Sequence, residues 1–174
     1  IKTYFGKLDK LLLFMCIGIA FFAVFIQYTL YENDISSAVT ASQYKTQIIA
    51  FIAGLVIAMA LAAINYKYLA KLWFIYVPLA MGLTLLLFTP LGIKREGADD
   101  IGWLDLGIMT IQPSEILKLA FILSLAFHLS KVEDRMNEPI HFILLCIHGA
   151  IPTLLIRQTG DDGPALVFLF IFIC

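Results

Sequence analysis

Five long runs of apolar residues, separated by short polar gaps, organise this sequence. The runs are residues 11–30, 46–64, 72–88, 116–129 and 140–156. Because a helix rises about 1.5 Å per residue, about 20 apolar residues cross a hydrocarbon core of about 30 Å. The first three runs are long enough by themselves, and the fourth reaches this length when Ser114 and Glu115 are included.

A sixth apolar run begins at Pro164 and continues to Cys174, which is too short to span a membrane. The pattern therefore predicts an all-α fold, a polytopic transmembrane helix bundle with five complete spans plus the start of a sixth. We expect residues 1–174 to form a single membrane domain.

The composition agrees with a membrane protein and argues against a soluble domain, a nucleic-acid-binding protein and a cysteine-based framework. Hydrophobic residues make up 61% and charged residues 14% of the chain, with a mean hydropathy of +0.91, whereas soluble domains are about 25% charged. A net charge of −1 offers no basic surface for nucleic acid. Cys16, Cys146 and Cys174 lie singly inside apolar runs, so neither a disulfide framework nor a cysteine metal site is expected.

The distribution of Lys and Arg predicts the orientation of the chain. Alternate gaps hold seven basic residues on the side of the N-terminus and four on the other side. The seven are Lys2, Lys7, Lys10, Lys67, Lys71, Lys131 and Arg135. The positive-inside rule places the N-terminus in the cytoplasm. It follows that residues 32–43, 91–112 and 157–163 face outward.

The connections between the runs differ in kind. Residues 65–71 are expected to form a tight turn between the second and third spans. Residues 89–113 combine glycines with Trp103 and several aliphatic side chains, so we expect a loop that packs back onto the bundle or onto the membrane interface, with Trp103 as an anchor in the aromatic belt. Within the second span, Gly54, Ala58 and Ala62 form a small-residue row, which indicates bundle packing or a dimer face.

The sharpest local signal is the segment Gln112-Pro113-Ser114-Glu115-Ile116-Leu117-Lys118. Pro113 suits the first turn of a helix, and Glu115 suits the positive end of the helix dipole. Lys118 lies three residues further on, on nearly the same face as Glu115. A charge at mid-membrane costs about 2.5–3.5 kcal/mol on insertion scales. Two interpretations remain: Glu115 and Lys118 pair beside a polar cavity, or Lys118 snorkels to the interface.

A second polar cluster follows the fifth apolar run: Arg157-Gln158-Thr159-Gly160-Asp161-Asp162. It is either a solvated turn or a site in which Arg157 binds phosphate while Asp161 or Asp162 binds a cation or positions a hydroxyl. His141 and His148 are seven residues apart without a nearby carboxylate, so we predict no metal site for them.

These motifs carry a family resemblance. Trp103-Leu104-Asp105-Leu106-Gly107, followed by Gln112-Pro113-Ser114-Glu115 and Lys118, resembles the signature of the SEDS membrane proteins, the RodA/FtsW/SpoVE group. Asn65-Tyr66 and the turn containing Gln158, Asp161, Gly163 and Ala165 resemble further family motifs. The resemblance covers essentially the whole chain, aligned with the N-terminal half of a family member. Family members have about ten spans of about 20 residues each.

The resemblance implies a peptidoglycan glycosyltransferase that polymerises lipid II at the bacterial cytoplasmic membrane together with a class B penicillin-binding protein. It implies that Lys118 or Arg157 stabilises phosphate and that the catalytic base lies beyond Cys174, so the 174 residues alone are expected to be inactive. A divalent cation accompanying the substrate pyrophosphate is the one cofactor considered. A flippase or transporter of lipid-linked precursor, and a membrane scaffold for a cell-wall synthesis partner, are the alternatives.

Overall fold

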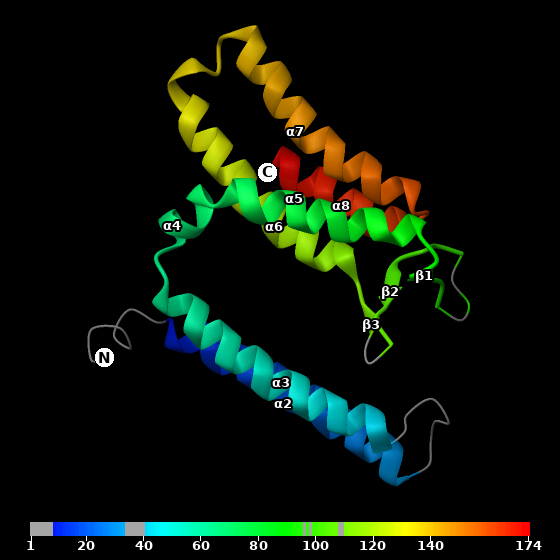
Figure 1. The fold of residues 1–174 in the computed structure, drawn as a ribbon. Helices are drawn as coiled ribbons and strands as arrows, with labels where there is room; N and C mark the ends of the chain where they lie inside the picture. The colour runs from blue at the N-terminus through cyan, green and yellow to red at the C-terminus, as the bar shows by residue number, and fades with distance from the viewer. Residues whose placement is uncertain (1–8, 34–40, 96, 98, 108–109) are drawn as a thin grey trace. The chain divides into compact units, whose positions relative to one another are not determined.

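The computed structural model describes residues 9–33, 41–95, 97, 99–107 and 110–174, and its contacts divide the chain into two compact units (Figure 1). Unit 1 is Ile1–Asn65 and unit 2 is Tyr66–Cys174. Lys2, Lys7 and most of the predicted outer segment 32–43 lie outside the described residues.

Unit 1 contains two long apolar helices, α2 (Lys10–Glu32) and α3 (Ala41–Ala63). Helix α2 begins at Asp9, whose carboxylate accepts a hydrogen bond of 3.0 Å from the Leu12 N–H and so caps the helix. None of the residues of α2 is buried, although the helix is apolar on all sides. A helix with apolar residues exposed around its whole circumference is typical of a membrane span.

The small-residue row of unit 1 lines a cavity of about 430 Å³ between residues of α2 and α3. A methyl group added at Gly54 would meet no atom within 4 Å. At Gly54, therefore, the row leaves open space and makes no close contact with a neighbouring helix. Both interpretations of the row, bundle packing and a dimer face, remain predictions.

Unit 2 contains the remaining elements. They are α4 (Tyr66–Lys71), α5 (Trp73–Leu85), η1 (Leu86–Phe88), β1 (Gly92–Ile93), β2 (Trp103–Asp105), β3 (Thr110–Ile111), α6 (Pro113–Val132), η2 (Glu133–Arg135), α7 (Pro139–Gln158) and α8 (Asp162–Ile173). Its core joins Ala80 of α5, Phe121 of α6, Ile156 of α7 and Phe168 of α8. The rings of Phe121 and Phe168 lie 5.4 Å apart, centroid to centroid. Four helices thus share one apolar core.

The long loop before α6 folds into a small antiparallel sheet of order β1-β2-β3 (Figure 1). Leu104 of β2 pairs with Gly92 on one side and with Ile111 on the other, and its side chain is fully buried. The Ile101 N–H donates a 2.9 Å hydrogen bond to the Thr159 carbonyl in the turn between α7 and α8. The predicted packing of this loop onto the bundle is confirmed.

One prediction about local structure is incomplete and another is wrong. The sequence predicts an all-α fold, whereas the structure also contains three short strands. These strands form because Leu104 and its neighbours bury apolar side chains while pairing their backbone groups. The expected tight turn at residues 65–71 is instead the helix α4, since Tyr66–Lys71 contains neither Gly nor Pro to break a helical turn.

The helices fit the predicted spans to different degrees. By length and composition, Lys10–Glu32, Tyr44–Ala63 and Pro139–Gln158 can each cross a membrane. The apolar helices Trp73–Phe88 and Asp162–Ile173 are shorter, and α6 has 20 residues but carries Glu115, Lys118 and Lys131. A polytopic helical membrane protein is supported, whereas five complete spans plus a sixth remains a prediction.

The orientation can be tested by single cysteines in a protein whose three native cysteines are replaced by serine. From the asymmetry of basic residues, Asp99→Cys should react with a membrane-impermeant maleimide in intact cells, and Glu133→Cys should react only after the cells are opened. Both native side chains are exposed, so burial does not bias the comparison. The reverse labelling pattern would contradict a cytoplasmic N-terminus.

A second test concerns Gly92 of β1. A methyl group there would overlap the carbonyl oxygen of Leu87 and lie 2.8 Å from the Ile101 side chain. We expect Gly92→Ala to lower the free energy of unfolding by about 1–3 kcal/mol, measured by thermal denaturation in detergent. Gly82→Ala is the matched control, because a methyl group at Gly82 meets nothing within 4 Å. Equal melting temperatures for the two variants would contradict the packing described here.

Candidate functional site

The structure brings together two segments that are far apart in the sequence, the loop before α6 and the turn between α7 and α8. The Gln112 side-chain amide donates to the Asp161 carboxylate at 3.4 Å. Gly102 lies beside them: a methyl group there would be 2.7 Å from an Asp100 carboxylate oxygen and 3.3 Å from one of Asp161. Glycine at this position leaves room for these side chains, and a larger residue would require the Asp100 carboxylate to move.

The first turn of α6 adds a charged pair to this region. Gln112 is extended, Pro113 begins the helix and Glu115 lies in its first turn. The Lys118 ammonium is 2.7 Å from the Glu115 carboxylate, and the Lys118 side chain is 22% exposed against 58% for Glu115. The two predicted partners therefore do pair. We call Asp100, Gln112, Glu115, Lys118 and Asp161 the polar cluster.

Asp161 is the electrostatic focus of the polar cluster. Partial burial raises its pKa above the ordinary value, and the carboxylates of Asp100 and Asp162 raise it further. The hydrogen bond from Gln112 and the charge of Lys118 lower the pKa, but the raising effects are larger. Asp161 therefore binds a proton more readily than an isolated aspartate does.

The other residues of the α7–α8 turn lie in more open surroundings. The Arg157 guanidinium is 3.9 Å from the Asp162 carboxylate, and these side chains are 73% and 79% exposed. Gln158 is the exposed last residue of α7. An exposed ion pair of this kind contributes little to stability. Of the two candidate aspartates, Asp161 rather than Asp162 contacts Gln112.

The loop motif from Trp103 to Gly107 has a structural role. The Arg95 guanidinium lies 3.5 Å from the centroid of the Trp103 ring, a cation–π contact. Asp105 accepts a 2.8 Å hydrogen bond from the N–H of Gly107, whose φ of +81° favours glycine. Ser114 is buried, and its hydroxyl has no hydrogen-bond partner in the described part of the chain.

Two contributors to this site escaped the sequence analysis. Asp100 enters the polar cluster and Arg95 covers Trp103, although nothing in the spacing of the loop residues singles them out. His141 and His148 do not share a site: His141 lies 3.3 Å from Glu138, whereas His148 contacts His128. Among the residues that the structure describes, no group of three His, Cys, Asp or Glu side chains is placed to hold a metal ion.

The raised pKa of Asp161 predicts a pH dependence. A carboxyl group whose pKa is higher in the folded protein than in the unfolded chain stabilises the fold at low pH, and this stabilisation is lost as pH rises from 3.8 through the folded pKa. Asp161→Asn should remove this contribution, so that the difference in melting temperature between variant and wild type changes with pH across that window. Asp100→Asn should lower the upper limit of this pH range, because it removes a negative charge that raises the pKa of Asp161. A pH-independent difference would contradict the assignment.

Comparison with known proteins places this geometry in context. Over 177 residues, the chain is 29% identical to a probable peptidoglycan glycosyltransferase FtsW of Trichlorobacter lovleyi, covering 92% of this chain and 43% of that protein. It is 28% identical over 170 residues to the protein of the same name from Methylomonas methanica, covering 94% and 43%. The chain therefore spans less than half the length of these relatives.

The fold is also similar to solved structures. One is a chain of a peptidoglycan synthase complex that coordinates polymerization and crosslinking, with a TM-score of 0.76, 24% identity, and coverage of 96% of this chain and 46% of that chain. Another is the rod shape determining protein RodA of Thermus thermophilus, with a TM-score of 0.75, 23% identity, and coverage of 96% and 54%. At this identity the similarity shows a shared fold.

The sequence profile of the FtsW/RodA/SpoVE family, described as cell cycle proteins, matches residues 7–174. That range contains the loop motif, the start of α6 and the α7–α8 turn that together build the polar cluster. The chain belongs to the FtsW/RodA/SpoVE family of cell cycle proteins.

Proposed function

We propose that the chain is part of a peptidoglycan glycosyltransferase and that the polar cluster binds the pyrophosphate end of lipid II. The observation that carries the proposal is the Lys118 ammonium, partly buried and held by Glu115 beside Asp161 and Gln112. A charge is retained in such surroundings at a cost, and a compact ammonium is well suited to phosphate. The names of the relatives support the same activity.

In this proposal the reaction is a displacement at a sugar carbon. A hydroxyl of one lipid-linked sugar attacks the anomeric carbon of another, a base takes the hydroxyl proton, and the pyrophosphate leaves with its negative charge. Lys118 stabilises the developing charge on the phosphate oxygens. Asp161 positions a substrate hydroxyl through its carboxyl group, while Glu115 holds Lys118 in place. The catalytic base is supplied from outside these residues.

The proposal extends to the setting of the reaction. The chain forms one membrane domain with five complete spans in the bacterial cytoplasmic membrane, and the polar cluster lies on the outer side. A class B penicillin-binding protein is the partner. The asymmetry of basic residues supports this orientation. A divalent cation travelling with the pyrophosphate fits the paired carboxylates of Asp100 and Asp161, because Mg²⁺ is commonly held by one or two carboxylates plus substrate phosphates.

The alternative of a flippase finds less support. It requires polar side chains to continue across the membrane from the polar cluster. A cavity bordered by Ser124 of α6 and His148 of α7 has apolar side chains for the rest of its lining. These are Trp73, Val77, Met81, Leu117, Phe121, Ile151 and Pro152. We therefore favour chemistry at one membrane face over transport.

Substitution of Lys118 tests the proposal in the whole gene product, purified with a class B penicillin-binding protein. Lys118→Met should lower the rate of lipid II polymerisation about 100-fold, the scale for losing one charge-stabilising donor, while abundance in the membrane stays near wild type. Lys118→Arg should also be impaired, because a planar guanidinium does not replace a compact ammonium. Gel electrophoresis of the glycan product measures the rate.

The matched control is Lys71→Met, which removes the same charge from an exposed residue of α4 outside the polar cluster. It should polymerise at the wild-type rate. Full activity of Lys118→Met would show that this side chain only snorkels, and the phosphate site would then have to lie elsewhere.

A further inference from the structure

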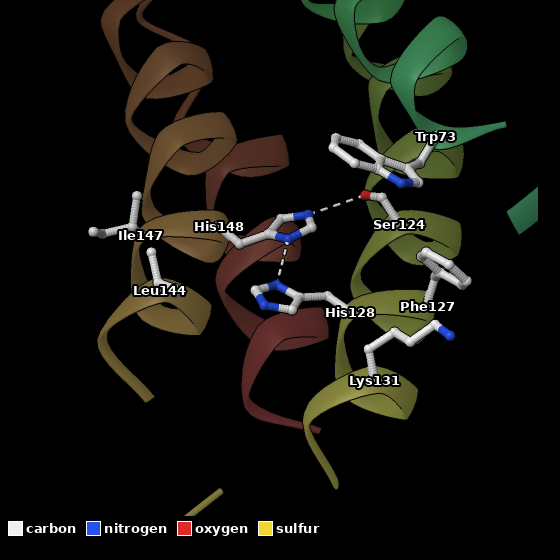
Figure 2. Close-up of a pocket in the computed structure, with 8 residues that line it drawn as sticks. All are labelled: Trp73, Ser124, Phe127, His128, Lys131, Leu144, Ile147 and His148. Carbon is white, nitrogen blue, oxygen red and sulfur yellow. Dashed lines mark hydrogen bonds between the residues drawn. The ribbon is translucent and has the colours of Figure 1, made fainter. Parts of the chain in front are cut away.

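A hydrogen-bond chain links α6 and α7 inside unit 2. The Nδ1 atoms of His128 and His148 are 3.0 Å apart, and Nε2 of His148 is 3.0 Å from the Ser124 hydroxyl (Figure 2). The Ser124 hydroxyl in turn donates to the Phe121 carbonyl at 3.1 Å. The rings of the two histidines are stacked, with centroids 5.2 Å apart.

The tautomers of the two histidines follow from the direction in which the Ser124 hydroxyl donates. With its single proton on the Phe121 carbonyl, the Ser124 oxygen accepts from Nε2–H of His148. A neutral His148 protonated at Nε2 has a bare Nδ1, which must accept from Nδ1–H of His128. The neutral ring of His128 therefore keeps an unprotonated Nε2, which is a hydrogen-bond acceptor without a bonded partner in the described part of the chain.

His128 and His148 border a cavity of about 370 Å³, within the range of about 300–1,000 Å³ found for small-molecule sites (Figure 2). Its walls are apolar and come from three helices: Trp73 of α5, Phe127 of α6, and Leu144 and Ile147 of α7. Such walls suit a hydrocarbon chain. Apolar walls alone do not explain why the acceptor Nε2 of His128 borders this cavity.

Lys131 supplies a positive charge at the same cavity. Its ammonium lies 5.6 Å from the centroid of the Phe127 ring, and among the described residues no carboxylate forms an ion pair with it. It lies in the last turn of α6, 13 residues and hence about 20 Å along the helix from Lys118. This cation and the acceptor of His128 are therefore separate from the polar cluster.

We propose that this cavity binds an anionic phospholipid whose head group carries a hydroxyl, the chemistry of phosphatidylglycerol. The phosphate pairs with the Lys131 ammonium, a head-group hydroxyl donates to Nε2 of His128, and an acyl chain lies along Trp73, Phe127, Leu144 and Ile147. A cation alone would select any anionic lipid. The bare acceptor adds selection for a hydroxyl donor, because an acceptor left unpaired in apolar surroundings is costly.

Trp73 provides the measurement, because it lines the cavity and the chain has two tryptophans. In the Trp103→Phe background, Trp73 is the sole tryptophan of residues 1–174, and its fluorescence in dioleoylphosphatidylcholine bilayers reports lipids brominated on their acyl chains. Brominated phosphatidylglycerol should associate with the Trp73 site about fivefold more strongly than brominated phosphatidylcholine. It should also be preferred about threefold over brominated phosphatidylmethanol, which has the same charge but no hydroxyl.

Two variants separate the contributions. Lys131→Met should abolish the preference over phosphatidylcholine, whereas Lys10→Met, the same change at an exposed residue of unit 1, should leave it intact. His128→Phe should abolish only the preference over phosphatidylmethanol.

Three results would overturn the proposal. One is equal quenching by all three lipids, and another is equal quenching by the two anionic lipids. The third is complete protection of Trp73 from every brominated lipid, which would show that a protein segment fills the cavity. The lipid comparison needs only the Trp103→Phe protein, so the proposal stays testable if a histidine variant fails to fold.

Discussion

The hydrogen bond from the Ile101 N–H to the Thr159 carbonyl is the contact on which the candidate site depends. It joins the loop before α6 to the turn between α7 and α8, two segments that are separated in the sequence by α6, η2 and α7. Once they are tied, Asp100 and Gln112 from the loop side reach Asp161 in the turn. The buried Leu104 anchors the sheet, and glycine at position 102 leaves the space that these side chains need.

Charge placement follows from the cost of putting ions in apolar surroundings. Lys118 is accommodated because Glu115 lies one helical turn away, at a distance of 2.7 Å. Asp161 and Asp100 have the opposite problem, since two carboxylates in one partly buried region repel. The result is an Asp161 with a raised pKa beside a cation, and the proposed binding of hydroxyl and phosphate groups rests on this combination.

Three hydroxyl side chains deeper in unit 2 are satisfied within their own helices. Thr84, Ser124 and Thr153 donate to backbone carbonyls three or four residues earlier in their own helices. Such bonds let hydroxyl groups enter apolar helices without an unpaired donor. His128 and His148 likewise find partners within the protein, because their Nδ1 atoms bond to each other. The second ring nitrogen of His128, Nε2, is left as an acceptor without a bonded partner in the described part of the chain. That remainder distinguishes the cavity beside Lys131 from an ordinary gap between helices.

The sequence by itself determined the apolar helices, the start of α6 at Pro113 and the placement of Glu115 and Lys118 on nearly the same helix face, because each depends on residues close together in the chain. It did not reveal the three strands, since strand pairing depends on partners that local patterns do not specify. Nor did it reveal Asp100 beside Asp161 or His128 beside His148, which are 61 and 20 residues apart. Only tertiary packing decides which distant side chains share one low-dielectric space, and that sharing sets their charges and hydrogen bonds.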